Sequence, residues 1–236
     1  INISGTTTNS APVLDLNGEV SGINYNATFT RGGGAVAVVD RNNLTLTDDG
    51  SNINSATVRI TNLQNGSSEV LNAVTTNTNI SAFYNNGILS LTGSDTVGNY
   101  QTVLRSIAYN NTAIIPNTTT RNIEFVVSDG SLNSTVATTT LAINMPTTSL
   151  GSNIMAGTRS RPPVASLNNT TTEVLYSFNL SSATRTVANL MMNGGNADLA
   201  LLDANGALLA SSVRSGTLAE NLDRTGLSAG NYFIRV

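Results

Sequence analysis

The chain has 236 residues, a formal net charge of −3 and 11% charged residues, with no His and no Cys, and every basic residue is an Arg. The usual general base, thiol nucleophile and Schiff-base amine are therefore missing, so we expect a protein that is not an enzyme. The acidic balance argues against a nucleic-acid partner, which needs a basic surface, and no apolar run is long enough for a membrane span.

Residues 11–147 are predicted to form an antiparallel β-sandwich, preceded by a strand-like arm over residues 1–10. Alternating apolar runs separated by Gly and Asn occur at 35–39, 43–47, 56–61, 87–92, 122–130 and 135–143. Residues 95–107 instead carry apolar side chains at helical spacing, which predicts one short helix with Asp95 as its N-cap. The aromatic residues expected to share the core are Tyr25, Phe29, Phe83, Tyr84, Tyr100, Tyr109 and Phe125.

The strand pattern lapses over residues 148–172, which we interpret as a linker. A second antiparallel β-sandwich is predicted over residues 173–236. Its strand-like runs lie at 173–180, 184–192, 197–203, 207–212, 216–222 and 231–236. Asn205-Gly206, flanked by apolar residues, predicts a hairpin with a type I′ turn. The expected fold class is therefore all-β, with two sandwich domains in tandem and one short helix in the first.

Several stretches of residues 11–143 resemble the cadherin-like repeats of large secreted bacterial proteins: "APVLDLNG", "GGGAVAVVD", "LTLTDDGSNINSATVRITNLQNG", "GILSLTGSDTVGNYQTVLRSIAYNN" and "RNIEFVVSDGSLNS". Residues from about 173 to 236 resemble the bacterial pre-peptidase C-terminal domain through "YSFNLSS", "NADLALLDANGALLASS" and "LSAGNYFIRV". Both resemblances imply a noncatalytic extracellular module of an adhesive or cell-surface protein that often binds calcium. The second family also accompanies secreted proteases.

Four Asp residues at the ends of predicted strands are the candidate metal ligands: Asp40, Asp48, Asp49 and Asp129. If they converge on one pole of the first sandwich, they supply carboxylate oxygens of the kind that calcium prefers. The alternative is that each Asp caps a turn, and Arg31, which stands where the resemblance implies an acid, favours this alternative. Glu69, Glu124 and Asp95 are interpreted as solvated charges at strand ends.

The last strand, in "AGNYFIRV", has no later strand to pair with, and the second resemblance implies one more strand after it. We therefore expect an open edge at Tyr232, Ile234 and Val236, filled by Ile1 and Ile3 of another copy's arm. This hypothesis makes the chain a structural subunit of a bacterial surface fibre or matrix that assembles head-to-tail. The alternatives are a fragment of a calcium-binding multidomain adhesin, or an accessory module of a secreted protease.

Overall fold

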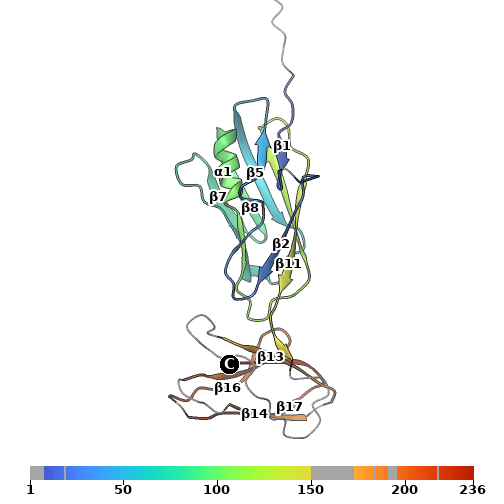
Figure 1. Cartoon of the computed structure of the whole chain (residues 1–236), viewed down its shortest axis with the longest axis vertical. Helices are drawn as coiled ribbons and strands as arrows, with labels where there is room; N and C mark the ends of the chain where they lie inside the picture. The colour runs from blue at the N-terminus through green and yellow to red at the C-terminus, as the bar shows by residue number, and fades with distance from the viewer. Residues whose placement is uncertain (1–7, 19, 150–172, 183, 191–195, 217) are drawn as a thin grey trace, which may run out of the picture. The chain divides into compact units, whose positions relative to one another are not determined.

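The computed structural model describes residues 8–18, 20–149, 173–182, 184–190, 196–216 and 218–236. The chain divides into two compact units, Ile1–Met145 and Pro146–Val236. Both units are built from β-strands, and the first also contains an α-helix (Figure 1), so the predicted all-β fold class is confirmed. Across the described residues, no helix has the length and apolarity needed to cross a membrane.

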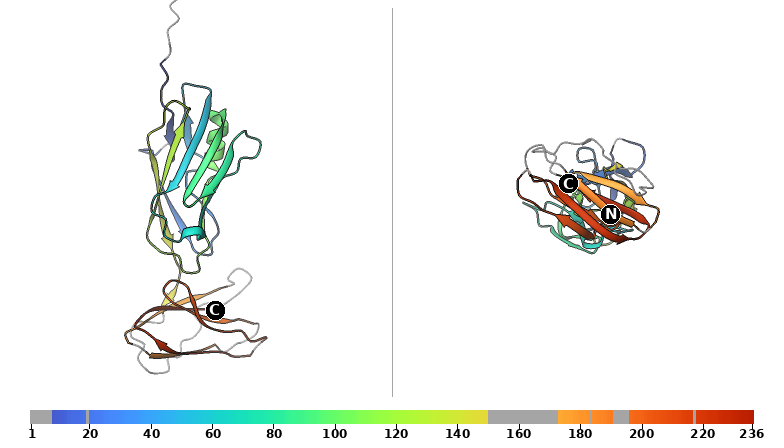
Figure 2. Two further views of the ribbon diagram at one scale, coloured as in Figure 1. Left: turned by 180° about the vertical axis from the view of Figure 1, so that it is seen from behind. Right: turned by 90° about the horizontal axis from the view of Figure 1, so that it is seen from below.

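The first unit contains a six-stranded sheet, seen from behind in Figure 2. In spatial order its strands are β2 (Tyr25–Thr30), β11 (Ala137–Asn144), β10 (Arg121–Ser128), β5 (Asn52–Ile60), β8 (Ile88–Thr96) and β7 (Ser81–Asn85). All neighbours pair antiparallel except β2 and β11, which run parallel. The sheet is therefore antiparallel, as predicted, except for this one parallel pair.

Two smaller sheets cover the inner face of this sheet. One pairs β1 (Val13–Asp15) with β4 (Thr45–Thr47), and the other orders β3 (Val36–Ala37), β9 (Ala108–Asn111) and β6 (Glu69–Asn72), which follows the 3-10 helix η1 (Gly66–Ser68). The Phe29 ring of β2 meets the Tyr109 ring of β9 edge-on, with centroids 5.3 Å apart. Thr139 Oγ1 of β11 also donates to the Val38 carbonyl at 2.6 Å. The layers therefore share one core.

The two-residue alternation of the strands decides which aromatic residues reach this core. Four of the seven predicted ones are buried, namely Phe29, Tyr100, Tyr109 and Phe125, and Tyr25 and Tyr84 pack against the cluster while half-buried. The prediction is wrong for Phe83, which is 68% exposed. Phe83 lies on the outward face of β7, away from the core. Because β7 is the last strand of the sheet, Phe83 also has a neighbouring strand on one side only.

The predicted helix forms as α1 (Val97–Arg105) and begins directly after β8. Its N-cap is Thr96, whose side chain accepts a hydrogen bond from Asn99 N at 3.2 Å, so the expectation that Asp95 caps it is wrong. Asp95 instead accepts from Asn79 N at 2.7 Å. The helix packs against β4, β5 and β8.

The hairpin between β7 and β8 turns through Asn86 and Gly87, both at positive φ (43° and 86°), which is the type I′ conformation. The predicted type I′ turn at Asn205-Gly206 is wrong. There only Gly206 has a positive φ, and its N–H donates to the Asp203 carbonyl at 3.1 Å. Asp203 closes this turn instead, because its Oδ1 also accepts from the backbone N–H of Asn205.

The second unit has a five-stranded sheet and a separate strand pair. The five strands are β12 (Thr148–Ser149), β13 (Leu175–Leu180), β18 (Gly230–Arg235), β15 (Leu199–Leu202) and β16 (Leu208–Ser212), and the pair joins β14 (Thr184–Leu190) to β17 (Glu220–Leu227). β12 pairs parallel with β13, so residues 148–149, predicted as the start of the linker, belong to this sheet. Residues 150–172 of that linker lie outside the described residues.

Candidate functional site

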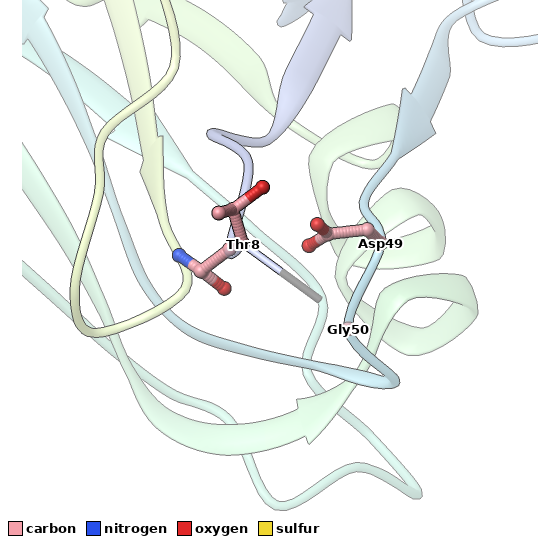
Figure 3. A pocket seen from close by; sticks show the side chains of 4 residues that line it. Thr8, Asp49 and Gly50 are labelled. Atoms are coloured by element: carbon pink, nitrogen blue, oxygen red, sulfur yellow. The ribbon is translucent and has the colours of Figure 1, made fainter. Parts of the chain in front are cut away.

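Two of the candidate calcium ligands lie beside the last residues of the arm. Asn9 Nδ2 donates to Asp129 Oδ2 at 2.8 Å, and the backbone N–H of Ser10 donates to Asp49 Oδ2 at 2.9 Å. A shallow hollow here is lined by Thr8, Asn9, Asp49 and Gly50 (Figure 3). The structure therefore brings Asp49 and Asp129 to the same arm segment.

Most carboxylate oxygens at this end already accept hydrogen bonds from the chain itself. Asp129 Oδ1 accepts from the N–H groups of Ser131 and Leu132, and Asp48 Oδ2 accepts from Gly50 N. The pKa of Asp129 is lowered by the Leu132 N–H, the Asn9 amide and the Ser131 N–H. These contacts are the turn capping that the alternative interpretation predicts.

Asp48 Oδ1 differs from these oxygens, because it is buried and has no hydrogen-bond partner. A buried polar atom without a partner is unfavourable, so it marks a place where a cation or a water molecule would be stabilising. Within the described part of the chain, however, no group of three or more His, Cys, Asp or Glu residues could hold a metal ion. The acidic side chains that the structure describes here therefore do not form a metal-binding group by themselves.

Asp40 does not join the other three Asp residues. Its Oδ1 accepts from the N–H groups of Asn42 and Asn43, at 2.9 and 3.0 Å. These two bonds are the main cause of its lowered pKa. The expected convergence of four carboxylates is therefore wrong for Asp40, which caps its own turn.

The helix α1 separates the turn that contains Asp40 from the segment that contains Asp48 and Asp49. Its first residue, Val97, donates its N–H to the carbonyl of Ser51, close in sequence to Asp48 and Asp49. Its last residue, Arg105, donates to the carbonyl of Leu44 at 2.7 Å, close in sequence to Asp40. A helix of this length spans roughly 13 Å, which is too far for one ion.

The terminal strand does not present an open edge, contrary to the prediction. β18 lies between β13 and β15, and Ile234 pairs with Tyr176 on one side and Leu201 on the other. The N–H and carbonyl of Val236 both bond to Val174 at 2.9 Å. A strand from earlier in the chain fills the position that we assigned to another copy.

The side chain of Tyr232 is also buried, in the core of the second unit, where its ring stacks on Phe178 with centroids 5.7 Å apart. Ile1 and Ile3, the other residues of the predicted subunit contact, lie outside the described residues. The second unit therefore offers no slot for an arm at its last strand.

A buried polar cluster in the first unit was not predicted from the sequence. Glu69 and Arg121 are both 0% exposed, and Arg121 Nε lies 2.8 Å from Glu69 Oε2. Tyr109 donates its hydroxyl to the same oxygen at 2.8 Å, and Glu69 Oε1 accepts from Gln64 N and Asn65 N at 2.9 and 2.5 Å. The interpretation of Glu69 as a solvated charge is wrong.

Asp95 is also buried, at 6% exposure, so the same interpretation fails for it. For Glu69 and Arg121, the two-residue alternation of the strands is the sequence signal that could have identified both as core residues. Arg121 is two residues before Ile123 and Glu69 is two residues before Leu71, and both of these apolar residues are buried. The charge of Glu69 suggested exposure to solvent, whereas its place in the alternation indicates the core.

The electrostatics of this cluster keep Glu69 ionised. Burial alone would raise its pKa, but the Arg121 guanidinium and the N–H groups of Asn65 and Gln64 outweigh burial, and the pKa lies below the ordinary value. Burial and the adjacent Glu69 charge raise the pKa of Tyr109. Through these hydrogen bonds the cluster joins β6, β9 and β10 in the interior of the first unit.

No protein-family model matches the chain, and no curated protein matches it. Among solved structures, one similar chain is the secreted serine protease VesC from Vibrio cholerae, with a TM-score of 0.25 and 11% identity. The match covers 81% of this chain and 41% of the protease chain. This chain therefore spans less than half the length of that protease, and the likeness is too low to support an argument about fold or function.

Proposed function

We propose that this protein is a noncatalytic structural module of a bacterial cell-surface or secreted protein, placed outside the cell. The location rests on the two family resemblances of the sequence. The observation that carries the noncatalytic part of the proposal is the state of Glu69, the most deeply buried carboxylate among the described residues of the first unit. All its oxygens are engaged by donors of the chain, and its pKa is lowered. A general acid needs the opposite environment, with a raised pKa and a free position facing a substrate.

The other partnered carboxylates support the same proposal. The pKa of Asp95 is lowered by the N–H groups of Asn79 and Thr96, and Glu220 is buried and accepts from Ser212 Oγ and Arg214 N. The sequence adds no His, Cys or Lys that could replace them in catalysis. Strand addition at β18 forms no part of this proposal, because both sides of that strand are paired.

Two measurements test the proposal. Immunogold labelling of intact cells of the producing bacterium is expected to place the protein on the surface or in the surrounding matrix, and label found only after permeabilisation would contradict the location. The full chain is also expected to release no product from ester, peptide and glycoside substrates. Saturable turnover that is lost in Glu69→Gln or Asp95→Asn would contradict the noncatalytic role.

The buried, unpartnered Asp48 Oδ1 favours a second candidate, a calcium-binding module of a multidomain adhesin. In this candidate, Asp48 and Asp49 supply carboxylate oxygens beside the arm residues, and calcium stabilises the pole of the first unit. Calcium would have to displace the hydrogen-bond donors that contact these carboxylate oxygens, such as Ser10 N on Asp49, or share the oxygens with them.

Thermal melting with calcium or with EDTA decides between the two candidates. A ligand that binds only the folded state raises stability by about 2.7 kcal/mol at one hundred times its Kd. The calcium candidate predicts a rise in Tm with calcium that disappears in Asp48→Asn. The control is Asp40→Asn, which lies outside the pole and is expected to keep the calcium effect. An equal Tm with calcium and with EDTA would rule out the calcium candidate.

A further inference from the structure

The strand β7 is an edge of the six-stranded sheet, and it lacks the features that usually protect edges. Within the described residues it pairs only with β8, in a register without a bulge. Residues 70–94, which include the β7–β8 hairpin up to Ser94, contain no charged residue and no Pro. Charges, Pro and bulges are the devices by which natural proteins prevent strand pairing at an edge. This edge is open to another strand.

The hairpin geometry determines which backbone groups face outward. In a two-residue hairpin the residues next to the turn, Asn85 and Ile88, form a hydrogen-bonded pair, and the pairs alternate from there. The backbone N–H and carbonyl of Phe83 therefore bond to β8, while Ala82 and Tyr84 direct their backbone N–H and carbonyl groups away from the sheet. These four groups are the hydrogen-bonding pattern that β7 offers to a partner.

The pattern is complementary to itself. If a second β7 approaches antiparallel with Phe83 opposite Phe83, then Ala82 of each copy exchanges two hydrogen bonds with Tyr84 of the other. Phe83 then occupies a non-hydrogen-bonded position, where opposite Cα atoms are about 4.5 Å apart and side chains are closest. Ile88 is 39% exposed on the same face and flanks the two rings.

We propose that two copies of this chain pair through β7, antiparallel and about a two-fold axis at Phe83, so that their six-stranded sheets join into one. The pairing covers the facing sides of two largely exposed Phe rings, and aromatic cross-strand pairs stabilise such contacts. A second copy fits better than a charged partner, because residues 70–94 supply no charge with which to bind one.

This contact has two consequences for assembly. It is isologous, so it closes on a dimer and does not extend into a fibre by itself. It is also small, because one short strand per copy contributes, so we expect a weak dimer that forms at high local concentration, such as on a surface. The proposal does not depend on the noncatalytic role or on calcium.

Single cysteines test the pairing directly, since the chain contains no other Cys. Phe83→Cys is expected to give a disulfide-linked dimer under mild oxidation, because its Cα separation of about 4.5 Å lies within disulfide range. Asn85→Cys and Ser81→Cys alone are the matched controls on the same face. Each would lie roughly 14 Å from its own copy across the axis, so neither is expected to cross-link with itself.

A second cross-linking experiment leaves Phe83 unchanged and depends on the exact register of the two strands. An equal mixture of Ser81→Cys and Asn85→Cys is expected to cross-link into a heterodimer, because residue 81 of one copy faces residue 85 of the other. Cross-linking of Phe83→Cys that is no faster than that of Asn85→Cys, or a mixture that yields no heterodimer, would overturn the proposal.

Sedimentation of the chain without introduced cysteines provides an independent measurement. The average mass of the full chain is expected to rise with concentration, and Phe83→Lys is expected to abolish the rise by placing two like charges on the axis. Val74→Lys, which changes another exposed residue of the uncharged segment, is expected to leave the rise unchanged. A constant monomer mass at every concentration, with folding shown by circular dichroism, would contradict the pairing.

Discussion

Arg121 and Glu69 show how a charged side chain can be fully buried at a position that the strand alternation assigns to the core. Arg121 Nη2 also donates to Asn65 Oδ1 and to the carbonyl of Asn117, so its donors are satisfied within the same cluster. Removing one partner of such a pair leaves an uncompensated charge in the interior, which is far less favourable than removing both. The contribution of the pair is therefore conditional on both residues.

A double-mutant cycle on this pair is the residue-scale prediction. Glu69→Gln and Arg121→Met are each expected to lower the free energy of unfolding by about 3–5 kcal/mol, and the double variant by less than the sum of the two. Urea unfolding at pH 7 measures all four proteins. Strictly additive losses would contradict the coupling.

The pH dependence of the same pair follows from the lowered pKa of Glu69. A group with a pKa below its unfolded value of 4.5 contributes stability above that pH, and the contribution is lost as the pH falls through the folded pKa. The stability gap between the wild type and Arg121→Met is therefore expected to narrow below pH 4.5. Urea unfolding repeated at acidic pH measures the gap, and a gap that is independent of pH would contradict the assignment.

At the scale of the element, α1 combines a side-chain N-cap with a glycine in its first turn. Thr96 caps the first turn, and Tyr100, Val103 and Leu104 bury the inner face. Gly98 lies in the first turn, where an added Cβ would meet no atom within 4 Å, and its φ is not positive. The glycine therefore serves no visible packing or turn role there.

Two substitutions in α1 are expected to change stability in opposite directions. Thr96→Ala removes the cap and is expected to lower the free energy of unfolding by about 1 kcal/mol. Gly98→Ala is expected to raise it by about 0.5–1 kcal/mol, since Ala restricts the unfolded chain and favours the helix. The control is Gly93→Ala in β8, which must destabilise because Gly93 has φ +123° and its added Cβ would lie 2.3 Å from the Asn79 carbonyl. Urea unfolding compares the three variants.

At the scale of the whole molecule, the two units have separate cores. The buried cluster of the first unit runs from Leu14 to Ile143, and that of the second from Phe178 to Tyr232, with no shared residue. Each unit also pairs its strands within itself. The described residues therefore form two separate hydrophobic clusters, one in each unit.

A truncated chain that ends at Met145 is accordingly expected to fold and to melt cooperatively. Its Tm is expected to match one of the transitions of the full chain, because no buried residue of the first cluster is lost. Differential scanning calorimetry of both chains makes the comparison. Loss of the cooperative transition in the truncated chain would show that the first unit requires the second.

Local patterns in the sequence determined the all-β class, the helix near residue 100 and six of the seven aromatic residues at the first core, because alternation and helical spacing act between neighbouring residues. Tertiary structure alone decided that β15 pairs with β18, that Asp40 stands apart from Asp129, and that Glu69 meets Arg121. Each of these depends on which distant strands become neighbours, and the free energy that selects them comes from burying the whole core, which no short stretch of sequence contains.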